Sequence, residues 1–329
     1  MERRYISDYF RLIRWQNLLF LAILIWVLEK WVCGPVLLAG GFFEVLPWWY
    51  LALLIGAAVC TAAGGYVIND YFDIKIDRIN RADKLIVTQT ISKDQAMMLY
   101  RIVTGVGVAL GLAASWIVRS WPMAVIFVFV PGLLWFYSSA YKRQFLLGNL
   151  IIALTSSLPP FLLAFANIGW LNHHFAVVMP YLTVNRDLIC WMSGFALFAF
   201  LMTWIREIIK DLQDQTGDRE FECHTLPIVL GEIWTKIILT ILILGTAGLL
   251  CYFCFVILPF PHTWNSLSTR YLVFGLLVPL GCEIGLLWAA KISTDYRHAQ
   301  LLMKFTMFLG ALFSFVIEKC SHSLLPFLL

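Results

Sequence analysis

The sequence predicts an all-α, polytopic membrane protein in which about nine transmembrane helices are bundled around a central cavity. Of its 329 residues, 61% are hydrophobic and only 13% are charged, about half the charged fraction that is usual in soluble domains. Apolar runs of about 18 residues or more recur along the chain, and each is long enough to cross about 30 Å of hydrocarbon as a helix. Because these runs are continuous rather than alternating, they favour helices over the strands of a membrane barrel.

We expect the first span to follow a short basic segment, residues 1–16, which contains four arginines. The apolar run that begins near Leu18 continues to Leu38, and no small-residue cleavage site follows it. We therefore interpret this run as a retained span rather than a cleaved signal peptide. Prolines mark the turns between several later runs, since proline cannot continue a helix. The expected spans lie at about residues 18–38, 48–68, 95–118, 122–140, 148–168, 189–209, 235–258, 270–290 and 299–318.

Two local features of these spans carry structural expectations. In the fifth span, Pro159 and Pro160 predict a kink, because a proline inside a helix removes a backbone hydrogen bond and crowds the preceding turn. In the third span, Gly107 and Gly111 form a Gly-x-x-x-Gly pair. This pair predicts a surface where another helix packs closely.

The distribution of basic residues predicts how the spans are oriented. In a nine-span arrangement, nineteen of the 24 lysines and arginines fall on the side that holds the N-terminus. Basic residues accumulate on the cytoplasmic side of membrane proteins. We therefore expect a multi-pass protein of the cell membrane with a cytoplasmic N-terminus. The opposite side holds Lys30, Arg119, Arg186, Arg270 and Lys319.

Two acidic motifs of matching spacing stand at the ends of spans on the predicted cytoplasmic side. The first is Asn69-Asp70-x-x-Asp73-x-x-x-Asp77, and the second is Asp211-x-x-Asp214-x-x-x-Asp218. Each aspartate of the first motif has a counterpart 141 positions later in the second. In a helix, this spacing would place the three carboxylates of each motif on one face. The repeat indicates an internal duplication, with halves at about 1–140 and 141–329.

The two motifs concentrate negative charge beside the membrane. Twelve of the chain's 20 Asp and Glu residues fall within the windows 70–94 and 207–232. Clustered carboxylates beside lipid are costly unless a cation compensates them, and oxygen-only ligands favour Mg²⁺ over zinc or copper. Because Mg²⁺ binds few carboxylates and keeps water or phosphate ligands, two facing clusters predict a lipid diphosphate bridged by Mg²⁺. For either motif alone, the alternative is a charged helix end at the lipid headgroups.

These paired motifs resemble those of the UbiA-type intramembrane prenyltransferases. The basic N-terminus, the nine spans and the motifs after the second and sixth spans match the family pattern over nearly the whole chain. The resemblance implies one prenyltransferase membrane domain over residues 1–329, a helical bundle around a cavity that the motifs cap. It also implies Mg²⁺-dependent transfer of a polyprenyl group from its diphosphate to an acceptor. The catalytic and metal-binding residues that it implies are Asp70, Asp73, Asp77, Asp211, Asp214 and Asp218.

Candidate substrate-binding residues surround the motifs. Basic side chains could bind phosphate oxygens, and tyrosine rings could shield an allylic cation. Arg14-Trp15-Gln16-Asn17 is similar to an Arg-Pro-x-Asn stretch of the family, which makes Asn17 a candidate. After the first motif, many members have Asn-x-Pro-x-Arg-Pro, whereas this chain departs from that pattern over residues 80–85 and has Lys84 where the family has arginine. The predicted set is Asn17, Asn69, Lys84, Tyr137, Tyr141, Lys142, Arg206 and Lys210.

The acceptor is predicted from the region of the second motif. The stretch from Arg206 to Asp211, continuing to Thr225-Leu-Pro227, looks most like the branch of the family that alkylates geranylgeranylglyceryl phosphate to make ether lipid. Prenylation of an aromatic quinone precursor is the alternative reaction. A transporter of divalent cations or lipids is the alternative from another class, although transporter sites lie near the bilayer midplane. We expect a polyprenyl diphosphate and membrane lipids as partners, and no nucleic acid.

Overall fold

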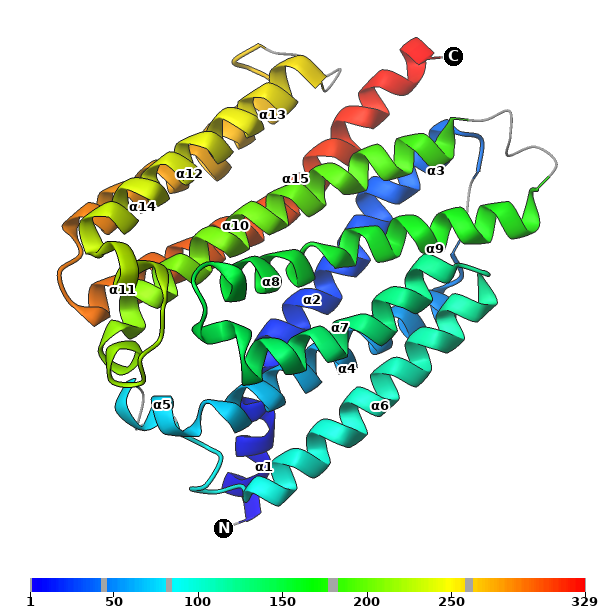
Figure 1. Cartoon of the computed structure of the whole chain (residues 1–329). Coiled ribbons are helices and arrows are strands. Elements are labelled where there is room, and N and C mark those ends of the chain that lie inside the picture. The colour runs from blue at the N-terminus through cyan, green and yellow to red at the C-terminus, as the bar shows by residue number, and fades with distance from the viewer. Residues whose placement is uncertain (1, 43–45, 81–84, 177–182, 258–262, 329) are drawn as a thin grey trace.

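The computed structural model describes residues 2–42, 46–80, 85–176, 183–257 and 263–328. Within these ranges, nine helical segments are long and apolar enough to cross a membrane, which confirms the predicted all-α membrane bundle (Figure 1). Their order and positions match the nine expected spans. The segments are Trp15–Ala39, Trp48–Phe72, Lys93–Ile117, Trp121–Ser139, Leu147–His174, Val184–Glu220, Glu232–Ile257, Leu267–Ala289 and Ser293–Lys319.

Helices in the first half of the chain pack around α4, which contacts α2, α6 and α7. A short amphipathic helix, α1, precedes the first span, and a π-helical turn at Glu29–Cys33 joins α2 to α3. The helices are α1 (Glu2–Leu12), α2 (Trp15–Leu28), α3 (Gly34–Ala39), α4 (Trp48–Phe72), α5 (Ile74–Asn80), α6 (Lys93–Ile117) and α7 (Trp121–Ser139).

Helices in the second half pack around the long helix α10, which contacts α8, α9, α12 and α15. In Figure 1, α10 crosses the middle of the bundle between the helices of the first half and those near the C-terminus. The helices are α8 (Leu147–Ser156), α9 (Leu158–His174), α10 (Val184–Glu220), α11 (Leu226–Leu230), α12 (Glu232–Tyr252), α13 (Leu267–Arg270), α14 (Val278–Ala289) and α15 (Ser293–Leu328).

The predicted kink in the fifth span is confirmed. The span is divided into α8 and α9 at Ser157, and the two prolines stand in the first turn of α9. Proline is tolerated there because the first N–H groups of a helix have no intrahelical acceptor. The Ser157 hydroxyl donates to the Leu154 carbonyl at 2.7 Å. This arrangement lets α8 begin beside the acidic motifs while α9 continues through the bundle.

The predicted glycine surface also packs closely. α6 lies along α4, and a Cβ placed on Gly107 would come 2.8 Å from the backbone nitrogen of Thr61. At Gly111, a Cβ would come 2.2 Å from the ring of Phe127 on α7. Neither glycine leaves room for a side chain. The pair therefore sets how near α6 lies to its two neighbours.

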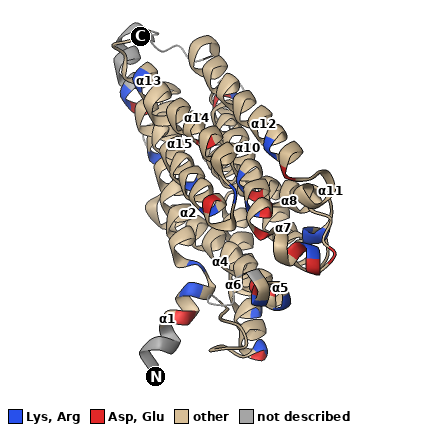
Figure 2. Cartoon of the chain, turned by 90° about the vertical axis from the view of Figure 1, so that its left-hand side faces the viewer, with Lys and Arg blue, Asp and Glu red and all other residues tan. Residues whose placement is uncertain are grey.

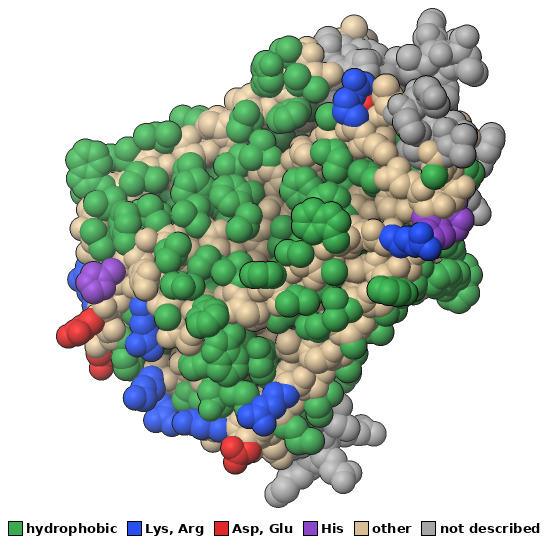
Figure 3. Space-filling view, turned by 45° about the vertical axis from the view of Figure 1, so that its right-hand side comes forward, with side chains coloured by type: hydrophobic (Ala, Val, Ile, Leu, Met, Phe, Trp, Pro, Cys, Tyr) green, Lys and Arg blue, Asp and Glu red, His purple; other side chains and the backbone are tan. Residues whose placement is uncertain are grey.

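Charged side chains gather toward one end of the bundle. In Figure 2, many Lys, Arg, Asp and Glu residues lie near α1, α5, α8 and α11, and fewer lie along the helices in the middle of the bundle. Figure 3 shows a broad hydrophobic face with basic and acidic side chains along its lower edge. This division fits a protein whose middle lies in hydrocarbon and whose charged end lies in water.

Candidate active site

The first acidic motif lies where α4 ends. Asp70 is in the last turn of α4, Asp73 separates the two helices, and Asp77 is on α5. The Asp73 backbone, at φ −82° and ψ −2°, departs from regular helix geometry and redirects the chain. The expectation that one helix carries this triplet is therefore wrong. A break at Asp73, the middle residue of the triplet, sets the directions of the carboxylates instead.

The second motif lies on one continuous helix, as predicted. α10 extends to Glu220, so Asp211, Asp214 and Asp218 stand on one face near its end. The helix therefore continues to Glu220, beyond the expected end of the sixth span near residue 209. The extra turns of α10 carry the carboxylates out of the apolar part of the span.

Side chains of both motifs line one cavity at the charged end of the bundle. Five of the six predicted aspartates belong to this lining, and Asp70 lies just beside it. The two motifs are therefore brought together, as the sequence predicted. The lining residues are Arg14, Asn69, Asp73, Ile76, Asp77, Tyr137, Lys142, Arg143, Asn149, Glu207, Lys210, Asp211, Asp214, Asp218, Cys223 and Thr225.

Asp73 is the most tightly held carboxylate of the first motif. It is 4% exposed, and its Oδ2 accepts hydrogen bonds from the Asn69 side chain at 2.7 Å and from the Lys142 ammonium. Asn69 is one helical turn before Asp73, whereas Lys142 comes from the short turn after α7. These contacts fix the carboxylate in a position where it lines the cavity.

Arg14 holds Asp70, the aspartate of the first motif that lies just beside the cavity lining. Its Nη2 donates to Asp70 Oδ1 at 2.7 Å, and its guanidinium lies 4.9 Å from the centre of the Tyr66 ring. Arg14 stands between α1 and α2 with φ 53° and ψ 52°, in the left-handed region that is uncommon for a residue with a side chain. That backbone turn directs the guanidinium from the first span toward the motif on α4.

Neutral side chains orient the second motif. Asn149, near the start of α8, donates its Nδ2 to Asp211 Oδ2 at 2.8 Å. The Thr225 hydroxyl, just before α11, donates to Asp218 Oδ2 at 3.3 Å. Both donors are buried. These two hydrogen bonds therefore connect α8 and the residue before α11 directly to the carboxylates on α10.

Glu207 adds a further carboxylate one helical turn before Asp211. It is 5% exposed, and Arg206 and Lys210 on the same helix both form ion pairs with it. Lys210 lines the cavity, whereas Arg206 does not. Glu207 thus extends the negative charge of the second motif one helical turn deeper into the bundle.

The cavity has an excess of negative charge. Its lining includes six carboxylate and four basic side chains, so a bound cation would relieve the repulsion between them. Burial alone would lower the pKa of Lys142, but the adjacent Asp73 outweighs it and raises that pKa above its ordinary value. Burial and the nearby Asp218 raise the pKa of Cys223 to about 11, so this cysteine is a neutral thiol at physiological pH.

The predicted substrate-binding residues divide into three groups. Asn69, Tyr137, Lys142 and Lys210 line the cavity. Arg206 is outside the lining but forms an ion pair with Glu207, which belongs to it. Asn17 and Tyr141 are also outside the lining, so substrate contact at these three positions stays a prediction. Lys84 lies outside the described residues.

Several lining residues were absent from the predicted set. The sequence could have identified Asn149 and Glu207 as site residues, because each is a polar residue at the end of a long apolar run, where ionisable and amide groups are costly without a role. The sequence indicates Arg14 only as part of the stretch that makes Asn17 a candidate. Its backbone turn, which no residue pattern encodes, is what brings it to Asp70.

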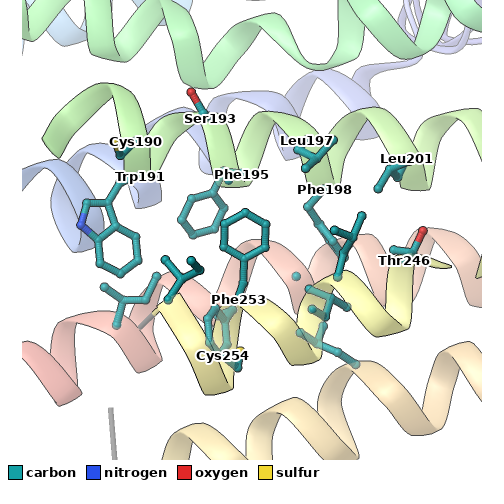
Figure 4. A pocket seen from close by; sticks show the side chains of 18 of the residues that line it. Cys190, Trp191, Ser193, Phe195, Leu197, Phe198, Leu201, Thr246, Phe253 and Cys254 are labelled. Carbon is teal, nitrogen blue, oxygen red and sulfur yellow. The ribbon is translucent and has the colours of Figure 1, made fainter. Parts of the chain in front are cut away.

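A second cavity, of about 620 Å³, lies further along α10. It contains none of the predicted site residues, and no charged side chain of the described chain lines it. Figure 4 shows Trp191, Phe195 and Phe198 from α10 around it, with Phe253 and Cys254 from the turn that follows α12. This apolar lining offers no catalytic group, so the smaller polar cavity is the candidate active site.

A membrane-embedded helical bundle with two facing carboxylate motifs over one cavity defines the class of intramembrane prenyltransferases. A family model described as the UbiA prenyltransferase family matches residues 30–311, which is most of the chain. The chain belongs to the UbiA prenyltransferase family. The predicted family and enzyme class are thereby confirmed.

Individual relatives agree in sequence and in fold. The digeranylgeranylglyceryl phosphate synthase of Sulfurisphaera tokodaii is 32% identical over 72% of this chain and 76% of the relative. A solved structure concerned with digeranylgeranylglyceryl phosphate synthase in membranes covers 97% of this chain and 100% of its own, with a TM-score of 0.60 and 23% identity. A UbiA homolog from Archaeoglobus fulgidus, bound to GPP and Mg²⁺, covers 95% and 99%, with a TM-score of 0.54 and 14% identity.

Proposed function

We propose that this enzyme transfers a polyprenyl group from its diphosphate to geranylgeranylglyceryl phosphate, a step of ether-lipid synthesis. The observation that carries this proposal is the convergence of both acidic motifs on one cavity at the end of the bundle. The acceptor follows from relatives named digeranylgeranylglyceryl phosphate synthase, such as the one from Sulfurisphaera tokodaii. A single domain over residues 1–329 is supported because residues from both halves of the chain line that cavity.

We propose Asp70, Asp73, Asp77, Asp211, Asp214 and Asp218 as the residues that hold Mg²⁺. The donor set fits, since it consists of carboxylate oxygens with an excess of negative charge. Among the described residues, no three carboxylate, histidine or cysteine side chains are arranged to hold one ion by themselves. Mg²⁺ usually takes one or two carboxylates and completes its shell with water and substrate phosphate, so a diphosphate between the motifs would supply the missing oxygens. When bound, the metal would neutralise the leaving diphosphate.

Basic side chains of the protein can further stabilise the negative charge of the leaving diphosphate. Lys142 and Lys210 line the cavity as cations, and they can stabilise the charge that develops on the diphosphate as its allylic C–O bond breaks. The bonding electron pair leaves with the diphosphate, and the acceptor oxygen forms the new C–O bond and releases its proton. Tyr137, which is buried beside Lys142, can shield the allylic cation from water.

We propose that this site faces the cytoplasm, because nineteen of the 24 lysines and arginines fall on the side of the membrane that holds the N-terminus and the motifs. Reporter fusions would test the orientation. A cytoplasmic reporter joined to the N-terminus should be active, and the same reporter joined after residue 176, between the fifth and sixth spans, should be inactive. The reverse pattern would overturn the orientation.

The reaction itself is tested with the purified protein. Labelled geranylgeranyl diphosphate should yield diphosphate and a labelled lipid when both Mg²⁺ and geranylgeranylglyceryl phosphate are present. Transfer to an aromatic acid instead would favour the quinone-precursor reaction, and an Asp73→Asn variant with full turnover would overturn the assignment of the motif. A transporter would release no diphosphate under any of these conditions.

A further inference from the structure

A pair of cations lies beside the acidic cavity without belonging to its lining. Arg206 is on α10, and Lys304 is on α15 within the span Ser293–Lys319. Lys304 is exposed between apolar neighbours, and among the described residues it forms neither a hydrogen bond nor an ion pair. A charged side chain inside a span is costly and usually marks a functional site. This pair therefore needs an explanation.

Contacts between α10 and α15 place Lys304 near Arg206. The Gln300 side chain donates to Gln213 Oε1 at 2.6 Å, which fixes the register of two helices that run in opposite directions (Figure 1). One turn further along α15, Lys304 is then level with the turn of α10 that follows Arg206. Phe308, on the same face of α15 as Lys304, meets the ring of Phe20 on α2 at 6.3 Å. Lys304 therefore lies where α2, α10 and α15 come together.

The charges around Lys304 are mostly of its own sign. Arg206, Arg14 and Lys210 are near enough to act on it, and Glu207 is the one carboxylate among its strongest electrostatic neighbours. Glu207 already pairs with Arg206 and Lys210. Like charges held together in a medium of low dielectric constant repel strongly. The cluster is thus short of negative charge, whereas the adjacent cavity has too much of it.

The two groups of cations differ in their partners. Lys142 and Arg14 are paired with Asp73 and Asp70, the carboxylates of the first motif. Within the described ranges, Arg206 forms no ion pair with an aspartate of either motif, and Lys304 forms no ion pair with an acid. A second anion, separate from the diphosphate, would complete the cluster. A phosphate monoester fits, since it carries nearly two negative charges and accepts several charge-assisted hydrogen bonds.

We propose that Arg206 and Lys304 bind the phosphate monoester of the acceptor lipid, beside the diphosphate site. This inference rests on the proposed function, in which the acceptor carries such a group. It assigns the choice between acceptors to a charge interaction, because the single carboxylate charge of an aromatic acid gains less from Lys304 than a phosphate monoester with nearly two negative charges.

Steady-state kinetics on the full-length protein in lipid nanodiscs tests the proposal. Lys304→Met should raise the KM for geranylgeranylglyceryl phosphate at least about tenfold, the loss expected for one charge-assisted hydrogen bond, while the KM for geranylgeranyl diphosphate stays unchanged. Lys304→Arg should retain most of the affinity. Lys319→Met, further along the same helix, is the matched control and should match the wild type.

Two further arms separate the outcomes. The wild type should prefer geranylgeranylglyceryl phosphate to its dephosphorylated alcohol, and this preference should shrink in Lys304→Met and in a second variant, Lys304→Gln. If the wild type uses neither lipid but accepts an aromatic acid, the proposed function fails and this inference fails with it. If the wild type uses and prefers the phosphate lipid but both Lys304 variants keep that preference, or if the donor KM rises instead, only this inference is overturned.

Discussion

The ammonium of Lys142 donates a hydrogen bond to Oδ2 of Asp73, across 69 positions of sequence. The contact joins the turn after α7 to the break between α4 and α5, and so it positions the first acidic motif against the rest of the site. Asp73 is nearly fully buried. Loss of its cation would leave a carboxylate that is desolvated and held by Asn69 alone.

We expect Lys142→Met to lower kcat/KM by about 10- to 100-fold, the cost of a buried charge-assisted contact. Lys142→Arg should recover part of the activity. Because the pKa of Lys142 is raised in the folded protein, the ion pair is fully present below the ordinary lysine pKa of about 10.4. The residual activity of the variant should therefore show the same pH profile as the wild type on its alkaline side up to that value.

Lys75→Met is the control for this experiment, since Lys75 is an exposed cation on α5, next to the same motif. Its kcat/KM should stay within about twofold of the wild type, in line with the small effect of most exposed substitutions. Equal losses in the Lys75 and Lys142 variants would show that general positive charge, rather than the contact with Asp73, supports the reaction.

Asn149 should matter through the carboxylate that it orients. Its Nδ2 donates to Asp211 Oδ2 at 2.8 Å, and Asn149 itself is 9% exposed. We expect Asn149→Leu to raise the Mg²⁺ concentration for half-maximal activity by about 10- to 100-fold, as is usual when a residue that supports a metal ligand is lost. Activity titrated against free Mg²⁺ measures the shift. A fall in kcat with an unchanged Mg²⁺ requirement would contradict an orienting role.

How far the sequence predicted this site depends on the range of the interaction. The spans, and the position of both motifs at span ends, follow from local patterns, namely apolar length and aspartate spacing, so these were predicted correctly. The roles of Arg14 and Asn149 were not, because each acts through a contact with an aspartate about 60 positions away. The break at Asp73 has the same origin: local spacing favours a continuous helix, and contacts from Lys142 accompany the change of direction.

Removal of the divalent cation should stop the reaction without unfolding the protein. The excess of carboxylates over basic residues in the cavity would then be uncompensated, while the apolar packing of the spans would be unchanged. We expect turnover to disappear on chelation with EDTA and to return on addition of Mg²⁺, with the helical circular dichroism signal constant throughout. Full turnover in the presence of EDTA would contradict a metal at the motifs.

Gly107 should be more sensitive to a methyl group than Gly105, although both stand on α6 two positions apart. At Gly107, a Cβ would lie 2.8 Å from the Thr61 backbone nitrogen, whereas at Gly105 nothing lies within 4 Å. Because backbone cannot move aside as a flexible side chain can, Gly107→Ala must separate α6 from α4, at a cost of about 1–3 kcal/mol. Thermal unfolding in detergent should show a lower midpoint for Gly107→Ala and no decrease for Gly105→Ala. Equal midpoints for the two variants would mean that α6 and α4 are less closely packed than these contacts imply.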